Sequence, residues 1–268
     1  MHSTRVSEPN GARRLRVAGA ELDVREIAPS RPGAPTLVFL HEGLGSADLW
    51  KEFPAALAAS TGCGTVAYSR RGNGFSTALT GPRNARYMHD EALVVLPAVL
   101  ESLQIAEPVL VGHSDGASIA LMFAGDRPQA VRALVLEAPH VFVEELSLRG
   151  IAAIRNAYER GGLRERMRPH HADADRTFYG WNDVWLSAAF RNWNVERFAE
   201  GVRAPVLALQ GLEDEYGTTA QLDAIARRAP APVDRILLAR CGHAPHRDRR
   251  VFVEAAVSAW LREKVALG

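Results

Sequence analysis

The residues of this chain with the clearest chemical potential lie between positions 109 and 124. The apolar run 109–111 predicts a buried strand, a Gly-x-Ser-x-Gly motif occupies 112–116, and the apolar stretch 117–124 predicts a buried helix. A serine between glycines at a strand-to-helix turn is typical of a nucleophile elbow, whose sharp bend exposes the hydroxyl above the sheet. We therefore predict that Ser114 has a strained backbone and acts as a nucleophile.

Two residues further along the chain could activate this serine. A serine hydroxyl is a weak nucleophile until a base accepts its proton, and with this motif an acid and then a histidine follow in chain order. Asp214 comes just after the apolar run 205–210, and His243 lies in a loop after the apolar run 236–238. The sequence predicts Ser114 as nucleophile, His243 as general base and then acid, and Asp214 as the group that orients the imidazolium.

Two more loops complete a resemblance to proteins of the α/β-hydrolase fold. Residues 39–45, Phe-Leu-His-Glu-Gly-Leu-Gly, resemble the oxyanion loop after the third strand of that fold. Residues 68–76 resemble its glycine-rich loop after the fourth strand. The resemblance covers nearly the whole chain. It implies an α/β fold with a mostly parallel eight-stranded sheet, helices on both faces and a helical lid insertion.

The resemblance also implies an oxyanion hole made by backbone amides. The expected donors are the N–H of Asp115, which follows the nucleophile, and an amide of the oxyanion loop. Glu42 stands where the family usually has glycine, which leaves the second donor open between Gly43 and Leu44.

Other side chains compete for the acid and base roles. Glu213 and Glu215 flank the predicted acid, and Glu137 ends another predicted strand. We favour Asp214 because Gly-x-x-Asp after this strand resembles the acid motif of the family. His246 is the weaker candidate for the base, and we expect it to begin a helix or to support the site.

Alternating strand and helix patterns predict a parallel sheet covered on both faces. Residues 14–18 and 21–27 are expected to form a hairpin at the edge of the sheet. Pro97 predicts a kink in a helix over 86–103, because proline removes a backbone donor. The remaining expected strands are 36–40, 65–68, 108–112, 132–137, 205–210 and 236–238.

The alternation stops between residues 140 and 203, where the pattern predicts helices over 142–160, 161–169 and 182–200. This region resembles a lid, so we divide the chain into a core, 1–139 and 204–268, and a lid, 140–203. His140, Trp181 and Trp185 are predicted to contact substrate. The alternative is that the aromatic residues form only the core of the lid itself.

Acidic side chains near the nucleophile suggest a substrate class. The Ser-Asp pair at 114–115 resembles the valacyclovir hydrolase branch of the family, whose members cleave esters of amino acids. The carboxylates of Asp115 and Glu42 could then favour a cationic or hydrogen-bond-donating substrate. The alternative is that both make structural hydrogen bonds. We expect His113 to point away from the reaction and to serve in packing.

Composition agrees with one enzyme domain that acts on a small molecule. The 268 residues suffice for one domain, and 47% are hydrophobic and 24% charged. The 32 basic and 31 acidic side chains create no net field that would attract nucleic acid or an anionic membrane. We expect no cofactor and no metal, treating His170 and His171 as surface residues, and the sequence leaves the oligomeric state open.

The start of the chain predicts a cytoplasmic location. Residues 1–18 are polar and arginine-bearing without an apolar central segment, so no secretory signal is expected. No apolar run approaches the roughly 20 residues that would span a bilayer. Residues 1–12 are predicted to be disordered.

Together these patterns predict a serine hydrolase that cleaves a small carboxylic ester, thioester or lactone through an acyl-enzyme. Hydrolysis of a carbon–carbon bond and a peroxidase-like activity are alternatives on the same fold. A non-catalytic receptor is less favoured because binding does not require a complete triad. A dinucleotide-binding enzyme would use Gly43, Gly45 and Arg70–Arg71, but the third glycine of that motif is absent.

Overall fold

The computed structural model describes residues 12–265. The segment predicted to be disordered, 1–12, lies outside the described residues except for Ala12, which begins the first strand. Within 12–265 no helix is both long and apolar enough to cross a membrane.

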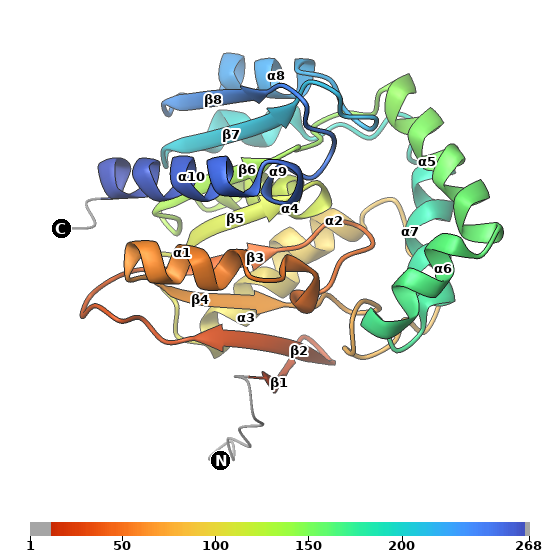
Figure 1. Ribbon diagram of the computed structural model, residues 1–268, viewed down its shortest axis with the longest axis horizontal. Helices are drawn as coiled ribbons and strands as arrows, with labels where there is room; N and C mark the ends of the chain where they lie inside the picture. The colour runs from red at the N-terminus through yellow and green to blue at the C-terminus, as the bar shows by residue number, and fades with distance from the viewer. Residues whose placement is uncertain (1–11, 266–268) are drawn as a thin grey trace.

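One eight-stranded sheet forms the centre of the molecule (Figure 1). Its strand order is β1-β2-β4-β3-β5-β6-β7-β8. β2 pairs antiparallel with β1 and β4, and every other neighbouring pair is parallel. The mostly parallel sheet and the edge hairpin are confirmed. The strands are β1 Ala12–Val17, β2 Ala20–Ile27, β3 Thr36–Leu40, β4 Gly64–Tyr68, β5 Val109–His113, β6 Ala133–Glu137, β7 Val206–Gly211 and β8 Val233–Leu238.

Helices cover both faces of this sheet, with α1 and α10 on one face and α3, α4 and α8 on the other (Figure 1). Successive side chains of a strand point to opposite faces. Leu37 and Phe39 of β3 therefore enter one core, and Val38 and Leu40 enter the other. The helices of the core are η1 Ala47–Trp50, α1 Phe53–Thr61, α2 Tyr87–Asp90, η2 Glu91–Val95, α3 Leu96–Ser102, α4 Asp115–Asp126, η4 Glu196–Gly201, α8 Ala220–Arg228, α9 Pro245–Asp248 and α10 Arg250–Lys264.

The helix predicted over 86–103 is irregular at the expected place. α2 passes into η2, a turn of π-helix, and α-helical pairing resumes in α3 with Pro97 in its first turn. Proline has no N–H to offer the carbonyl one turn earlier, so the hydrogen-bond ladder changes its spacing there.

Three helices stand together beyond the carboxyl ends of the parallel strands, at the right of Figure 1. They are α5 Glu145–Glu159, α6 Gly162–Met167 and α7 Ala174–Leu186, with the short η3 Arg168–His170 after α6. All of them lie between β6 and β7 in the chain, which is the region predicted to be helical.

The predicted position of the third helix, 182–200, is wrong. α7 begins at Ala174 because Asp173 caps it, its carboxylate accepting the N–H of Arg176 at 2.8 Å. The helix ends at Leu186, and turns follow until η4. An isolated bridge between Phe142 and Asn194 holds that stretch in a non-helical conformation.

The strand order brings two distant loops together. From β3 the chain moves outward to β4 and then returns to β5 on the other side of β3. Open α/β sheets bind ligands at such a switch point, outside the carboxyl ends of the strands. The loop after β3 and the turn after β5 therefore share one site.

Close packing at the second glycine of the elbow makes the turn possible. A Cβ atom added to Gly116 would overlap the carbonyl oxygen of Leu40 at the end of β3. A Cβ at Gly112 would come within 2.6 Å of the Cα of Ala117. Helix α4 can lie this close to the sheet only because both positions lack a side chain.

We expect Gly116→Ala to lower the free energy of unfolding by about 3 kcal/mol or to prevent folding, because backbone must move to admit the methyl group. Urea denaturation followed by circular dichroism measures the effect. Gly81→Ala is the matched control, since a Cβ there meets nothing within 4 Å. Equal stability of Gly116→Ala and the control would contradict the packing argument.

Candidate active site

Ser114 lies at the turn between β5 and α4 with backbone angles φ 54° and ψ −119°. A non-glycine residue rarely adopts a positive φ, so the predicted strain is present. The N–H of Ser114 donates to the carbonyl of Glu137 in neighbouring β6 at 2.9 Å, which ties the turn to the sheet. The side chain is held at the end of the strand and faces the helices between β6 and β7.

The side chains of His243 and Asp214, from two other loops, form a chain of contacts with this serine. Nε2 of His243 lies 2.9 Å from Oγ of Ser114. Nδ1 of the same ring lies 2.8 and 2.9 Å from the two carboxylate oxygens of Asp214. This geometry allows Nε2 to accept the serine proton while the carboxylate stabilises the positive ring.

The carboxylate of Asp214 has enough donors to stay ionised although it is buried. It accepts hydrogen bonds from the N–H of Tyr216 at 2.8 Å and from Nε2 of Gln210 at 2.6 Å. Burial raises the pKa of Asp214, but His243 and the amide donors outweigh burial and hold the pKa below its ordinary value. The acid can therefore balance a cationic His243.

The competing acids and the competing base occupy other positions. Glu137 is buried and accepts from Nδ1 of His246 at 2.6 Å. The His246 ring stacks on Phe53 at 5.5 Å, on the α1 side of the sheet. His246 lies in the first turn of α9, as predicted, and Glu213 is exposed.

The oxyanion loop, residues 41–45, forms a tight turn in which the N–H of Gly45 donates to the carbonyl of Glu42 at 3.1 Å. Gly43 and Leu44 are the central residues of this turn. Among the described residues, no hydrogen bond uses the N–H of either one. Asp115 is the first residue of α4, so its N–H also lacks an acceptor within the helix. The three predicted oxyanion donors are thus unengaged near Ser114.

A cavity of about 610 Å³ opens above the serine. All four predicted substrate-contacting residues, Glu42, His140, Trp181 and Trp185, line it together with Ser114. The apolar side chains in its wall are Leu44, Leu49, Ile151, Ile154, Leu163 and Met167. Helices α5, α6 and α7 thus contribute most of these apolar side chains and both tryptophans.

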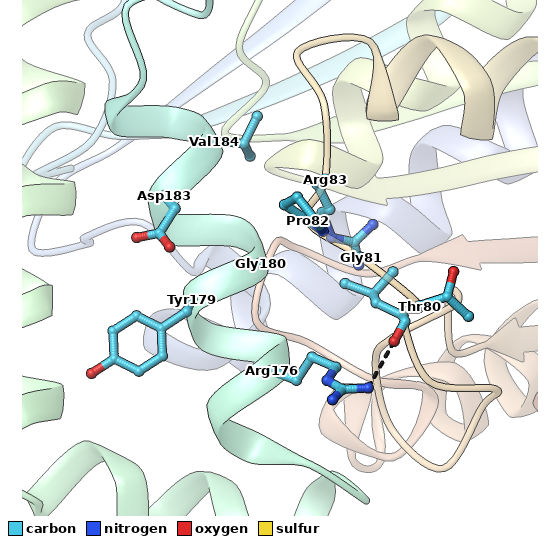
Figure 2. Close-up of a pocket in the computed structure, with 10 residues that line it drawn as sticks. Thr80, Gly81, Pro82, Arg83, Arg176, Tyr179, Gly180, Asp183 and Val184 are labelled. Atoms are coloured by element: carbon cyan, nitrogen blue, oxygen red, sulfur yellow. Dashed lines mark hydrogen bonds between the residues drawn. The ribbon is translucent and has the colours of Figure 1, made fainter.

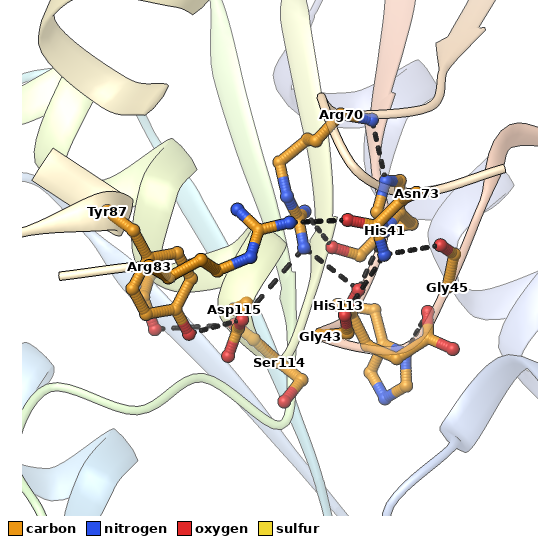
Figure 3. Close-up of polar contacts among 12 residues, drawn as sticks. His41, Gly43, Gly45, Arg70, Asn73, Arg83, Tyr87, His113, Ser114 and Asp115 are labelled. Atoms are coloured by element: carbon orange, nitrogen blue, oxygen red, sulfur yellow. Dashed lines mark hydrogen bonds and ion pairs between the residues drawn. The ribbon is translucent and has the colours of Figure 1, made fainter. Parts of the chain in front are cut away.

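The hypothesis that Asp115 contacts substrate is wrong, because its carboxylate does not line this cavity. The side chain is buried, accepts from the hydroxyl of Tyr87 at 2.6 Å and lies 3.9 Å from the guanidinium of Arg70 (Figure 3). Burial raises the pKa of Asp115, and the two partners only partly offset it. A carboxylate held by these partners cannot bind substrate. The hypothesis of a cationic substrate therefore rests on Glu42 alone.

Glu42 carries its negative charge into the cavity wall. Its Oε2 lies 3.7 Å from Nδ1 of His113. Burial raises the pKa of Glu42, but His113 outweighs burial and keeps the pKa below its ordinary value. Glu42 is therefore an anion beside the oxyanion loop.

His113 does not point away from the site as expected. Its ring lines the cavity, and its Nε2 donates to the backbone carbonyl of His243 at 2.7 Å. Burial lowers the pKa of His113, but Glu42 outweighs burial and the net pKa is raised. His113 thus connects the oxyanion loop with the loop of the candidate base. No spacing in the sequence indicates this role.

His140 packs between the candidate base and the helical region. Its ring centroid lies 5.6 Å from that of His243 and 5.2 Å from that of Trp185. Burial and the nearby His243 lower the pKa of His140 to about 3, so the ring is neutral at pH 7. A neutral ring there does not oppose a positive charge on His243.

The aromatic residues between β6 and β7 divide into two groups. Trp181 and Trp185 line the cavity, which agrees with a contact to substrate. Phe178 stacks on Tyr158 at 3.8 Å and Phe190 on a neighbouring ring at 5.2 Å, and neither lines the cavity. Trp181 and Trp185 are thus placed as the first interpretation requires and the other aromatics as the second, and contact with substrate stays a prediction.

A second cavity, about 270 Å³, lies between loop 79–83 and α7 (Figure 2). Arg176 closes one side of it by donating to the carbonyl of Leu79 at 2.8 Å. Neither Ser114 nor its two partners contribute to this cavity. The candidate active site therefore borders the larger cavity.

His170 and His171 lie in different surroundings, since His170 lines the large cavity and His171 is buried. Nδ1 of His171 accepts the N–H of Gly74 at 3.0 Å, so this ring is buried and structural rather than exposed. Within residues 12–265 no group of three or more histidine, cysteine, aspartate or glutamate side chains is placed to hold a metal ion.

Comparison with known proteins agrees with this fold. Residues 35–178, more than half of the chain, match the family model described as the alpha/beta hydrolase fold. The chain belongs to the α/β hydrolase fold family.

Two curated relatives match part of this α/β hydrolase. A protein of Klebsiella pneumoniae (strain 342) named as a carbamate hydrolase, RutD, is 41% identical over 112 residues, which cover 41% of this chain and 40% of that protein. The 2-succinyl-6-hydroxy-2,4-cyclohexadiene-1-carboxylate synthase of Salmonella paratyphi C (strain RKS4594) is 33% identical over 112 residues, covering 42% and 41%. The chain thus spans about two fifths of the length of these relatives.

Solved structures are similar over nearly the whole α/β hydrolase. The enol-lactonase of Burkholderia xenovorans LB400 has a TM-score of 0.74 at 20% identity, covering 93% of this chain and 100% of that one. An α/β hydrolase fold protein of Chitinophaga pinensis has a TM-score of 0.76 at 16% identity, covering 94% and 98%. At these identities the similarity shows the fold alone.

The buried His171 predicts a pH dependence of stability. Burial lowers the pKa of His171 to about 4, whereas an unfolded histidine has a pKa near 6.5. Between these values the unfolded chain binds more protons, so the free energy of unfolding falls as the pH falls. We expect His171→Gln to make this slope shallower, by up to about 1.4 kcal/mol per pH unit.

Urea denaturation at several pH values from 7 to 4 measures the slope. His170→Gln is the comparison variant, because burial also lowers the pKa of His170 but that ring is partly exposed. An unchanged slope in a folded His171→Gln variant would mean that this ring binds protons equally in the native and unfolded states.

Proposed function

We propose that this α/β hydrolase cleaves a small carboxylic ester, thioester or lactone through an acyl-enzyme on Ser114. The observation that carries the proposal is the pair of consecutive contacts from Ser114 to His243 and from His243 to Asp214. A strained serine that lines a cavity beside a hydrogen-bonded histidine is the arrangement that nucleophilic catalysis requires.

The reaction proceeds in two halves. Oγ of Ser114 attacks the carbonyl carbon while Nε2 of His243 takes the hydroxyl proton, and amides of Asp115 and of Gly43 or Leu44 donate to the oxyanion. The intermediate collapses, and His243 gives its proton to the departing alcohol or thiol. Water then attacks the acyl-enzyme with His243 as base, and the acid is released as Ser114 regains its proton. No cofactor takes part in these steps.

The names of similar proteins favour acyl transfer. The names of the carbamate hydrolase and the enol-lactonase refer to substrates that contain a carbonyl group. The synthase relative, 33% identical over 112 residues, makes carbon–carbon bond chemistry the second candidate. A receptor function is disfavoured because it would not need the three contacting side chains. A peroxidase-like activity is supported by none of these names.

The cavity suggests how substrate is held. Trp181 and Trp185 would pack against the acyl or leaving group, and neutral His140 would border it beside the base. The helices of region 140–203 would act as a lid that excludes water and strengthens the field at the oxyanion. The boundaries of this lid and the cytoplasmic location stay predictions.

We expect Ser114→Ala to reduce kcat with a chromogenic short-chain ester by about 10,000-fold or more, because the acyl acceptor is removed. A fluorophosphonate probe should label the wild-type protein and not this variant. Ser187→Ala, outside the cavity, is the control and should keep both properties. Full turnover by folded Ser114→Ala would refute the mechanism. If the wild-type protein turns over thioesters, lactones or carbon–carbon substrates instead of esters, that result would narrow the substrate class.

We expect Glu42→Gln to lower the preference for an amino-acid ester over a neutral ester of equal size by about 10-fold, because one charge-assisted contact to the ammonium is lost. The measured quantity is the ratio of the two kcat/KM values, which cancels a general loss of activity. Glu213→Gln is the matched control, since Glu213 is exposed outside the cavity wall. An unchanged ratio in Glu42→Gln would assign Glu42 a structural role.

A further inference from the structure

We propose that Asn73 is a positioning residue for the oxyanion hole, holding the oxyanion loop so that its amides face the reacting carbonyl. The inference rests on the proposed acyl transfer at Ser114. It concerns a side chain from the loop after β4, which contributes nothing to the cavity wall and has no part in the proposed proton transfers.

The side-chain amide of Asn73 is completely buried beneath the oxyanion loop. Its Nδ2 donates to the carbonyl of Gly43 at 3.1 Å and to the carbonyl of Gly45 at 3.0 Å (Figure 3). Its Oδ1 accepts from the guanidinium of Arg83 at 2.7 Å. Both N–H bonds of the amide are used, and the Arg83 contact prevents a flip of the amide.

A neighbouring arginine holds the start of the same loop. Buried Arg70 donates to the carbonyl of His41 and, at 2.9 Å, to that of Glu42. Arg70 is therefore unavailable for a 2′-phosphate, which removes one basis of the dinucleotide alternative. Together Arg70 and Asn73 fix the carbonyls on both sides of the turn.

The direction of each of these carbonyls determines the direction of the N–H group that follows it. In a trans peptide the C=O of one residue and the N–H of the next point in opposite directions. Since the carbonyl of Gly43 points to Asn73, the N–H of Leu44 points away from Asn73. Since the carbonyl of Glu42 points to Arg70, the N–H of Gly43 points away from Arg70. Both free amides are thus turned from the buried side, and Gly43 and Leu44 line the cavity with Ser114.

The lid region closes the other side of Gly43. A Cβ atom there would overlap the indole nitrogen of Trp181, so the residue is held between Trp181 and the amide of Asn73. The two N–H donors of buried Asn73 keep the peptide between Gly43 and Leu44 from rotating. Rotation would exchange a donor for a carbonyl oxygen beside the developing negative charge.

The test is Asn73→Asp, which keeps size and the acceptor for Arg83 but cannot donate to Gly43 and Gly45. We expect kcat for the short-chain ester to fall by about 10- to 100-fold with KM changed less than about 3-fold, because only transition-state contacts weaken. The affinity for a boronic acid inhibitor, which forms a tetrahedral adduct with the serine, should fall by the same factor as kcat/KM. Asn84→Asp is the matched control at an exposed position and should leave all values unchanged.

Asn73→Ser provides a second, neutral variant that retains one donor and should lose less kcat than Asn73→Asp. If Asn73→Asp does not fold, Asn73→Ser tests the positioning role instead. A merely structural role would lower the melting temperature while kcat and boronate affinity of the folded protein stay within about 2-fold, and that result would overturn the inference. If the wild-type protein neither turns over esters nor binds the boronate, the proposed function fails instead.

Discussion

The approach of α4 to the end of β3 is the constraint on which the site depends. Gly116 leaves no room for a side chain beside the carbonyl of Leu40. The helix can start immediately after β5 only if Ser114 takes a positive φ, and that conformation lifts its side chain out of the sheet. Because His41 follows Leu40, the same contact brings the oxyanion loop beside the nucleophile. One packing contact thus sets both the position of the hydroxyl and the distance to the amides that face it.

Pairs of an acid and a histidine surround this contact, and their geometry separates their roles. His243 with Asp214 reaches the serine, His246 with Glu137 is buried on the α1 side, and His113 connects Glu42 with the carbonyl of His243. The ring of His113 lies 5.1 Å from those of both His243 and His246. Burying a charge is costly unless it is paired, so each carboxylate needs its own partner. Of these three histidines, His243 is the one whose ring nitrogen lies within hydrogen-bond distance of the Ser114 hydroxyl.

Local patterns predicted most of what positions the site. The elbow, the strands and the loops after β3, β5 and β7 follow from apolar runs and glycines that each lie within a few residues of one another. The direction of a side chain next to the turn depends on distant partners. Asp115 turns to Tyr87 and Arg70, and Asn73 turns to the oxyanion loop, through contacts across 28 to 45 positions of the chain. The apolar pattern does not predict the start of α7 for a simpler reason, because the cap at Asp173 stands in the polar stretch 170–176.

The family match and the geometry support different parts of the active site. The matched segment, residues 35–178, contains the oxyanion loop and the elbow but ends within α7, before Asp214 and His243. The acid and the base are supported instead by contacts that the fold makes between loops after β7 and β8. Those loops follow strands that are adjacent and parallel in the sheet, so they emerge at the same edge as the nucleophile. A folded sheet of this order brings together residues 129 positions apart, which is why the contact of His243 with Ser114 is independent support for hydrolysis rather than a repetition of the family match.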